Sequence, residues 1–174
     1  MRKTLIVVDM QNDFVYGPLS TDESKLIVRN VKNKIYKYNE QGDWIIFTRD
    51  THYDDYLSTN EGKKLPISHC IKNTYGWKIA EGLEVENCIY INKSTFGWIY
   101  WRETFGKYNI RSEEIELIGL CTDICVVSNA IILKASFPNA EITVDVSCCA
   151  GVTPETHKAA LETMKVCQIN IIGE

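Results

Sequence analysis

The fold of this chain is decided by the stretch Glu114-Ile115-Glu116-Leu117-Ile118-Gly119-Leu120-Cys121-Thr122-Asp123-Ile124-Cys125-Val126-Val127. Its first half is a short apolar run rich in branched residues, which is typical of a buried strand. A tight turn follows, and Thr122 or Asp123 can cap a new helix there. Cys125 then falls in the first turn of that helix, where free N–H groups and the positive end of the helix dipole favour a thiolate.

Cys125 has two interpretations on this stretch alone. Free cysteines are among the most buried residue types, so an apolar helix can simply carry Cys125 in the core. A cysteine just past the carboxyl end of a parallel strand, however, lies where open α/β sheets keep their active sites. Whether Cys125 is a core residue or a reactive cysteine depends on which residues lie at the other strand ends.

The rest of the chain alternates strand-like and helical patterns. Apolar, strand-like runs occur at residues 5–8, 44–48, 88–91, 115–120, 142–146 and 168–172. Helical patterns lie between several of them, at residues 27–38, 124–135 and 154–167. This alternation predicts an α/β, three-layer fold with a six-stranded parallel sheet flanked by helices. No repeat, low-complexity tract or linker divides residues 1–174, so we expect a single domain.

The composition is that of an ordinary globular protein with a slight negative charge. Apolar residues make up 45% of the 174 residues and charged residues 24%, which allows a sizeable core. A net charge of −4 without a basic run argues against nucleic acid or an anionic membrane surface as the main partner. The first apolar run is too short for a signal segment or a membrane span, so we expect a cytoplasmic protein.

The seven cysteines follow no disulfide or zinc pattern. Their number is odd, their spacing is irregular and no Cys-x-x-Cys pair occurs, so we interpret most of them as small core residues. This argues against a redox or metal-storage protein. The chain also lacks Gly-x-Gly-x-x-Gly and Gly-x-x-x-x-Gly-Lys after any strand, which argues against a nucleotide-binding module without hydrolytic chemistry.

Two other strand ends carry residues that suit a reactive cysteine. Asp9 follows the run at residues 5–8, and Lys93 follows the run at residues 88–91. Taken singly, they are typical of a turn-forming acid and a surface lysine. The carboxyl ends of parallel strands share one edge, however, so Asp9 and Lys93 should meet Cys125 there. An ammonium lowers the pKa of a thiol and a carboxylate can take its proton, so the three predict nucleophilic catalysis.

Six motifs then occur in order along nearly the whole chain: Val8-Asp9-Met10-Gln11-Asn12-Asp13-Phe14, Asp50-Thr51-His52, His69-Cys70, Lys93-Ser94-Thr95-Phe96, Gly119-Leu120-Cys121-Thr122-Asp123-Ile124-Cys125-Val126 and Ala150-Gly151-Val152-Thr153-Pro154. With these motifs the chain resembles the isochorismatase-like cysteine hydrolases, which have a Rossmann-like fold, and most of all the nicotinamidases. The resemblance implies a catalytic triad of Asp9, Lys93 and Cys125. It also implies a cis peptide before Cys121, and an oxyanion hole made by the backbone N–H groups of Cys121 and Cys125. Some relatives that cleave a vinyl ether lack the cysteine, so Cys125 favours amide hydrolysis.

The connection from residue 50 to about residue 86 is weakly periodic, and connections of this length usually carry function. Asp50 and His52 have the i, i+2 spacing with which one extended segment reaches a single ion, and His69 follows later. Such a set suits a divalent metal, zinc first, with iron or manganese as alternatives. The nicotinamidases are similar in this set, and the resemblance adds Glu61, nine positions after His52, as a further ligand. Other relatives use another histidine, near the position that Ser58 occupies here.

The resemblance implies metal-assisted hydrolysis of nicotinamide to nicotinate and ammonia through a thioester on Cys125. In nicotinamidases the metal holds the pyridine nitrogen and aromatic side chains pack on the ring. Phe14 is the clearest candidate for such a side chain and Phe96 the next, whereas Trp98 is expected in the core. The third histidine, His157, is expected to face solvent at the start of the last helix.

One departure from the nicotinamidases leaves an alternative substrate. They often place an aromatic residue just before the later histidine, where this chain has Leu65-Pro66-Ile67-Ser68. A related amidase acting on another small amide, a carbamoyl or a ureido compound, is therefore the second hypothesis. Those relatives generally lack the metal set, which favours nicotinamide. Because relatives often assemble from identical subunits, the expected partners are a small-molecule amide and, in a homo-oligomer, copies of the same chain.

Overall fold

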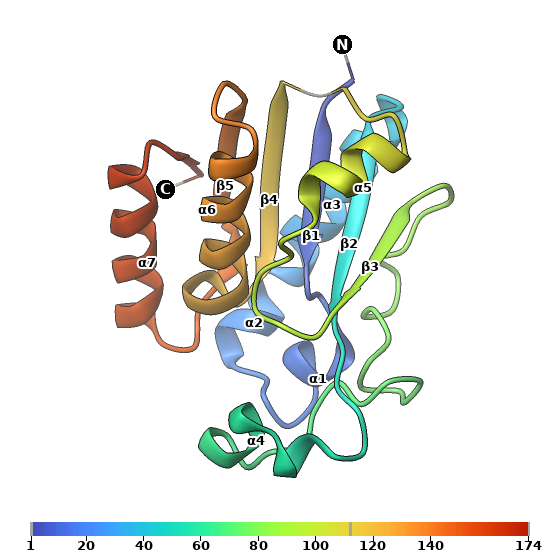
Figure 1. The fold of residues 1–174 in the computed structure, drawn as a ribbon, viewed down its shortest axis with the longest axis vertical. Coiled ribbons are helices and arrows are strands. Elements are labelled where there is room, and N and C mark those ends of the chain that lie inside the picture. Colours follow the sequence, from blue (N-terminus) through green and yellow to red (C-terminus); the bar gives the residue numbers. More distant parts are fainter. Residues whose placement is uncertain (1, 112, 174) are drawn as a thin grey trace.

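Six parallel strands form one sheet in the order β3-β2-β1-β4-β5-β6 (Figure 1). The computed structural model describes residues 2–111 and 113–173. The strands are β1 (Thr4–Val8), β2 (Trp44–Asp50), β3 (Ile89–Lys93), β4 (Glu114–Leu120), β5 (Glu141–Ala150) and β6 (Asn170–Ile172). The predicted α/β fold with a six-stranded parallel sheet is confirmed.

Helices cover both faces of this sheet, and α3 lies behind it while α5 and α6 lie in front (Figure 1). Each face has its own apolar core, one with residues of α1 and α3 and the other with residues of α5, α6 and α7. A short 3-10 turn (Tyr56–Ser58) and α4 lie beyond the carboxyl ends of the strands (Figure 1). The helices are α1 (Asn12–Val15), α2 (Asp22–Leu26), α3 (Val28–Glu40), α4 (Asn60–Lys64), α5 (Trp101–Lys107), α6 (Val127–Ser136) and α7 (Pro154–Val166).

The central strand β1 shows why its sequence is apolar without a break. Leu5 and Val7 belong to one core, and Ile6 and Val8 belong to the other. Successive side chains of a strand point to opposite faces, so a strand that is covered on both sides needs apolar residues at every position. All four of these side chains are fully buried.

The order of the strands reverses between β1 and β4, which are neighbours in the sheet. In open α/β sheets, ligands bind outside the carboxyl ends of the strands at such a point. Gly119 in β4 allows the close approach, because its φ is +117° and a Cβ there would overlap the carbonyl oxygen of Val8. The ends of β1 and β4 therefore place Asp9 and the turn of Cys125 next to each other.

Each strand differs from its predicted run at one end or both, β3, β5 and β6 among them. β3 begins at Ile89, one residue after Cys88. It extends to Lys93, which is therefore the last residue of the strand and not a residue beyond it. β6 begins at Asn170, because Gln168 adopts a φ of +61° just after α7, a conformation typical of a helix end. β5 extends to Ala150. Within residues 2–111 and 113–173, no helix is long and apolar enough to cross a membrane.

Candidate active site

Lys93 lies at the centre of the predicted catalytic residues. Its side chain is fully buried, and Nζ lies 2.6 Å from Asp9 Oδ2 and 3.5 Å from Cys125 Sγ. The same nitrogen lies 3.5 Å from Asp50 Oδ1. Burial lowers the pKa of Lys93, but these acidic neighbours raise it well above its usual value. One permanent ammonium thus faces two carboxylates and the thiol.

Asp9 is held in a conformation that is unusual for a non-glycine residue, with a φ of +48° directly after β1. The Thr48 hydroxyl donates to Asp9 Oδ1 at 2.7 Å and also lies 3.2 Å from the Asp9 backbone N–H. Burial raises the pKa of Asp9, and the Lys93 ammonium offsets only part of that rise. The carboxylate is therefore more basic than an exposed one, as suits a group that accepts a proton from a thiol.

Cys125 lies in a π-helical turn, Thr122–Val126, which runs directly into α6. The Cys121 carbonyl accepts from the N–H groups of Ile124 and Val126, on either side of the Cys125 N–H. Such π turns are common at functional sites. Cys121 occupies the N-cap position and no side chain caps the turn, so the predicted cap by Thr122 or Asp123 is wrong.

The prediction that this turn favours a thiolate is also wrong. Burial raises the pKa of the Cys125 thiol well above its usual value, and the Lys93 ammonium offsets only part of the rise. The cysteine is 5% exposed, so a thiolate would lose nearly all of its hydration. The resting side chain is thus a neutral thiol beside a basic carboxylate.

Leu120 and Cys121 are joined by a cis peptide bond, as the resemblance implied. Cys121 and Cys125 both line one cavity at the carboxyl end of the sheet, with a volume of about 920 Å³. Cys121 is the N-cap residue of the turn that contains Cys125. The two residues that were expected to form an oxyanion hole are therefore in one place.

The four expected metal ligands form a second cluster in this cavity. One ligand atom each of Asp50, His52, Glu61 and His69 lies within 4.8 Å of all the others. His52 Nε2 is 2.9 Å from Asp50 Oδ2 and 3.6 Å from Glu61 Oε1, and His69 Nε2 is 3.5 Å from Asp50 Oδ2. Two imidazoles and two carboxylates fit zinc, iron(II) or manganese. Ser58 is not part of the cluster, since its hydroxyl donates to the Asp55 carbonyl.

Several hydrogen bonds orient these ligands. His69 Nδ1 donates to the Ile67 carbonyl at 2.8 Å, so Nε2 is the ring nitrogen that faces the cluster. The Gln11 side chain accepts from the Asp50 N–H at 2.7 Å and donates to the Asp50 carbonyl at 2.9 Å. Burial raises the pKa of Asp50, but His52, His69 and Lys93 lower it well below its usual value. Asp50 is therefore ionised, as a metal ligand must be.

Aromatic side chains line the cavity, and two of them are the expected ones. Phe14 is buried with its ring centre 5.6 Å from that of His69, whereas Phe96 is 47% exposed. Trp98 is not among the lining residues, and its backbone N–H donates to Asn129 Oδ1. It packs against the core on the α6 side of the sheet, as expected.

Tyr56 is a cavity wall that the sequence analysis missed. Its side chain is 1% exposed, and its ring centre lies 4.6 Å from that of His52 and 5.0 Å from that of His69. Its hydroxyl donates to the Leu65 carbonyl, and Leu65 itself lines the cavity as part of the aliphatic run. The available signal was an aromatic residue four positions after His52 in the long connection.

His157 does not face solvent, so that prediction is wrong. The ring is half-buried, and its Nδ1 lies 2.8 Å from the hydroxyl oxygen of Thr122. The first turn of α7 packs directly against the π turn of Cys125. This contact joins segments 35 residues apart in the sequence, so no local pattern indicates it.

The family model of the isochorismatase domain matches residues 3–173. The chain belongs to the isochorismatase family. The nicotinamidase of Schizosaccharomyces pombe is 25% identical to it, over 98% of this chain and 92% of the relative. The crystal structure of a nicotinamidase from Bacillus subtilis superposes with a TM-score of 0.85 at 25% identity, over 98% of this chain and 99% of that chain.

Another similar isochorismatase-family structure is the pyrazinamidase of Pyrococcus horikoshii in complex with zinc. Its TM-score is 0.84 at 27% identity, over 100% of both chains. The family model and these relatives together show that the protein is a hydrolase that acts on amide C–N bonds.

Proposed function

We propose that this enzyme hydrolyses nicotinamide to nicotinate and ammonia, with a divalent metal bound beside the nucleophile Cys125. The observation that carries the proposal is that the metal-ligand cluster and Cys125 line one cavity. The two sets share a contact, because Asp50 approaches the histidines with one carboxylate oxygen and Lys93 with the other. The nicotinamidase and pyrazinamidase relatives support a pyridine- or pyrazine-type carboxamide as substrate.

In the first stage, the Cys125 sulfur attacks the carboxamide carbon while the thiol proton passes to Asp9. Lys93, which stays protonated, stabilises the negative charge on the sulfur as the proton leaves. The oxyanion that forms accepts hydrogen bonds from the N–H groups of Cys121 and Cys125. Asp9 then returns the proton to the amide nitrogen, the C–N bond breaks, ammonia leaves and a thioester remains on Cys125.

In the second stage, Asp9 takes a proton from a water molecule that attacks the thioester carbon. The C–S bond then breaks, and nicotinic acid leaves and loses its own proton to water to give nicotinate. The proton held by Asp9 returns to the sulfur, which restores the thiol. The raised pKa of Asp9 suits this exchange, because the same carboxyl has to accept and return a proton in each stage.

Asp50, His52, Glu61 and His69 would hold the metal, for which we propose zinc, with iron(II) and manganese as ions that the same ligands accept. When bound, the metal supplies a Lewis-acid site for the ring nitrogen of the substrate. Phe14, Tyr56 and Phe96 line the cavity around that position and would pack against the ring.

The test is an ammonia-release assay with nicotinamide, pyrazinamide and aliphatic amides, run with and without a chelator. We expect turnover of the two aromatic amides, loss of turnover with chelator, and none in C125A. Mass spectrometry after an acid quench should detect an acyl adduct on Cys125, and H52A should retain less zinc than the unmodified protein. Chelator-insensitive turnover of aliphatic, carbamoyl or ureido compounds alone would instead support the second hypothesis.

The proposed reaction places the enzyme in NAD salvage, since nicotinate is a precursor of that cofactor. We further propose that residues 1–174 act as one isochorismatase-like domain, with the metal-site connection at about residues 50–86. All seven cysteines are free thiols, which suits the reducing cytoplasm.

A further inference from the structure

The start of α7 holds the π turn of Cys125 through two side chains of that turn. Thr122 is fully buried and directly follows Cys121, and its hydroxyl oxygen lies 2.8 Å from His157 Nδ1. Burial lowers the pKa of His157, and Asp123 offsets part of that effect, so the imidazole is neutral at pH 7. A neutral ring can make one directional hydrogen bond to the Thr122 hydroxyl.

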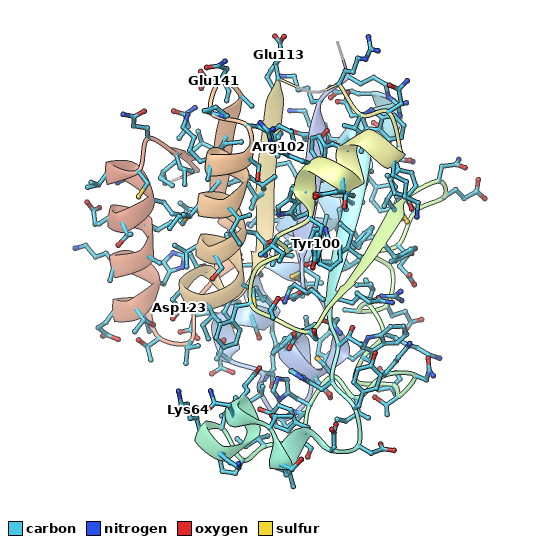
Figure 2. The ribbon with its side chains drawn as sticks, viewed as in Figure 1. Lys64, Tyr100, Arg102, Glu113, Asp123 and Glu141 are labelled. Atoms are coloured by element: carbon cyan, nitrogen blue, oxygen red, sulfur yellow. The ribbon has the colours of Figure 1, made fainter. Side chains whose placement is uncertain are left out.

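Asp123 makes the second connection between the same two segments. Its two carboxylate oxygens lie 3.1 and 3.0 Å from the Val152 backbone nitrogen, and the Thr156 hydroxyl donates to the carboxylate as well. Figure 2 shows Asp123 at the carboxyl end of the strands, beside the start of α7. Both polar side chains of the turn are thus bound by residues 152–157.

Gly151 shows how closely the two segments pack. A Cβ at this position would lie 2.8 Å from His157 Cβ and 3.2 Å from a carboxylate oxygen of Asp123. Gly151 also lines the cavity that contains Cys125. The contact between α7 and the π turn therefore reaches the wall of the active site with little room to shift.

We propose that His157 is a positioning residue, which acts through Thr122 to hold the turn from Cys121 to Cys125 in the geometry that stabilises the oxyanion. This inference rests on the proposed function, in which these two residues supply the oxyanion donors. His157 does not touch the substrate, since it is not among the residues that line the catalytic cavity. His157 instead fixes Thr122. Thr122 directly follows Cys121 and lies three positions before Cys125, and these two residues supply the donors.

The role predicts a selective loss of transition-state stabilisation. Loss of a whole oxyanion donor lowers kcat by about 10²–10³-fold in other hydrolases, and a misplaced donor keeps part of its effect. We therefore expect H157A to lower kcat by about 10- to 100-fold, with KM changed by less than about threefold. T122V should behave in the same way, and the double variant should be no worse than either single variant, because both remove one interaction.

Two conservative variants test which ring nitrogen matters. The side-chain amide of H157N reaches the position of Nδ1, whereas that of H157Q reaches the position of Nε2. H157N should keep kcat within about threefold of the unmodified enzyme, and H157Q should resemble H157A. K158A, at the exposed neighbouring position of α7, is the matched control and should be unaffected. If H157A does not fold, the comparison of H157N with H157Q decides.

Two further measurements separate positioning from general damage. Pyridine-3-carbaldehyde adds to a cysteine and leaves an oxyanion, so its affinity should fall in H157A by the same factor as kcat/KM. Iodoacetamide alkylates Cys125 by displacing iodide and forms no oxyanion, so that rate should stay within about twofold. An equal fall in alkylation and kcat, an unchanged kcat in H157A, or equal activity of H157N and H157Q would overturn the proposal. If nicotinamide is not hydrolysed, the proposed substrate is wrong, and the same variants are compared on whichever amide the enzyme does hydrolyse.

Discussion

Replacing Lys93 by methionine should destabilise the protein strongly, although the side chains are similar in length. Lys93 is fully buried, and its ammonium is the positive partner of Asp9 at 2.6 Å and of Asp50 at 3.5 Å. Removing one partner of a buried ion pair leaves an uncompensated charge and costs about 3–5 kcal/mol. In a chain of this size, that cost lowers Tm by roughly 6–20 °C.

The second half of this prediction is a partial rescue. In the double variant D9N/K93M, the closest carboxylate is neutral, so most of the lost stability should return, to within about 1–2 kcal/mol of the unmodified protein. Activity should not return, because the double variant lacks both the base and the cation. Loss of the general base alone lowers rates by about 10²–10⁴-fold.

The pH dependence of K93M adds an independent signature. Without the ammonium, burial raises the folded-state pKa of Asp9 further above its unfolded value. The folded state then binds more protons than the unfolded state, so stability falls as pH rises above about 4, the pKa of Asp9 in the unfolded chain. Urea unfolding followed by circular dichroism, with chelator present, measures the stability of the unmodified protein and of both variants. A K93M protein within 1 kcal/mol of the unmodified one, or a double variant less stable than K93M, would refute the reasoning.

Three further predictions concern other parts of the molecule. G119A should lower the free energy of unfolding by about 3 kcal/mol or more, seen as a lower Tm, because of its positive φ and the overlap with the Val8 carbonyl oxygen; an unchanged Tm would contradict this. Y56L should raise KM about tenfold with little change in kcat, since a packed ring contributes about 1–1.5 kcal/mol, whereas Y56F should bind normally. The Lys34 ammonium, 2.7 Å from Asp145, holds the pKa of that carboxyl below its usual value despite burial. Stability should therefore fall as pH drops below about 4. K34M should reduce this loss of stability at acid pH, as measured by urea titrations.

Local patterns were sufficient for the class of the fold and for much of the site. The strands β1, β2, β4 and β5 were each visible as apolar runs, because a strand covered on both faces is apolar at every position. The strand-end residues Asp9 and Cys125 followed from that reading, since parallel strands end at one edge. The metal set followed from spacing within one connection and from the resemblance to nicotinamidases.

The wrong predictions concern properties that depend on burial and on distant contacts. The thiol pKa of Cys125 was expected to be low from its place in a helix turn, but burial raises it and outweighs the nearby Lys93 ammonium. His157 was expected in solvent, yet it contacts Thr122 across 35 positions of sequence. Tyr56 gave no periodic signal, because it lies in a segment whose shape is set by what it packs against.

The sequence by itself therefore determined the α/β class, the order of strands and helices, and the residue types at the carboxyl edge of the sheet. These are consequences of local periodicity and of chain order, which act within a few residues. Only the tertiary structure decided that Lys93 bridges Asp9, Asp50 and Cys125, and that α7 holds the nucleophile turn. Protonation and orientation at this site depend on how completely water is excluded and on which distant groups replace it, and packing alone sets both.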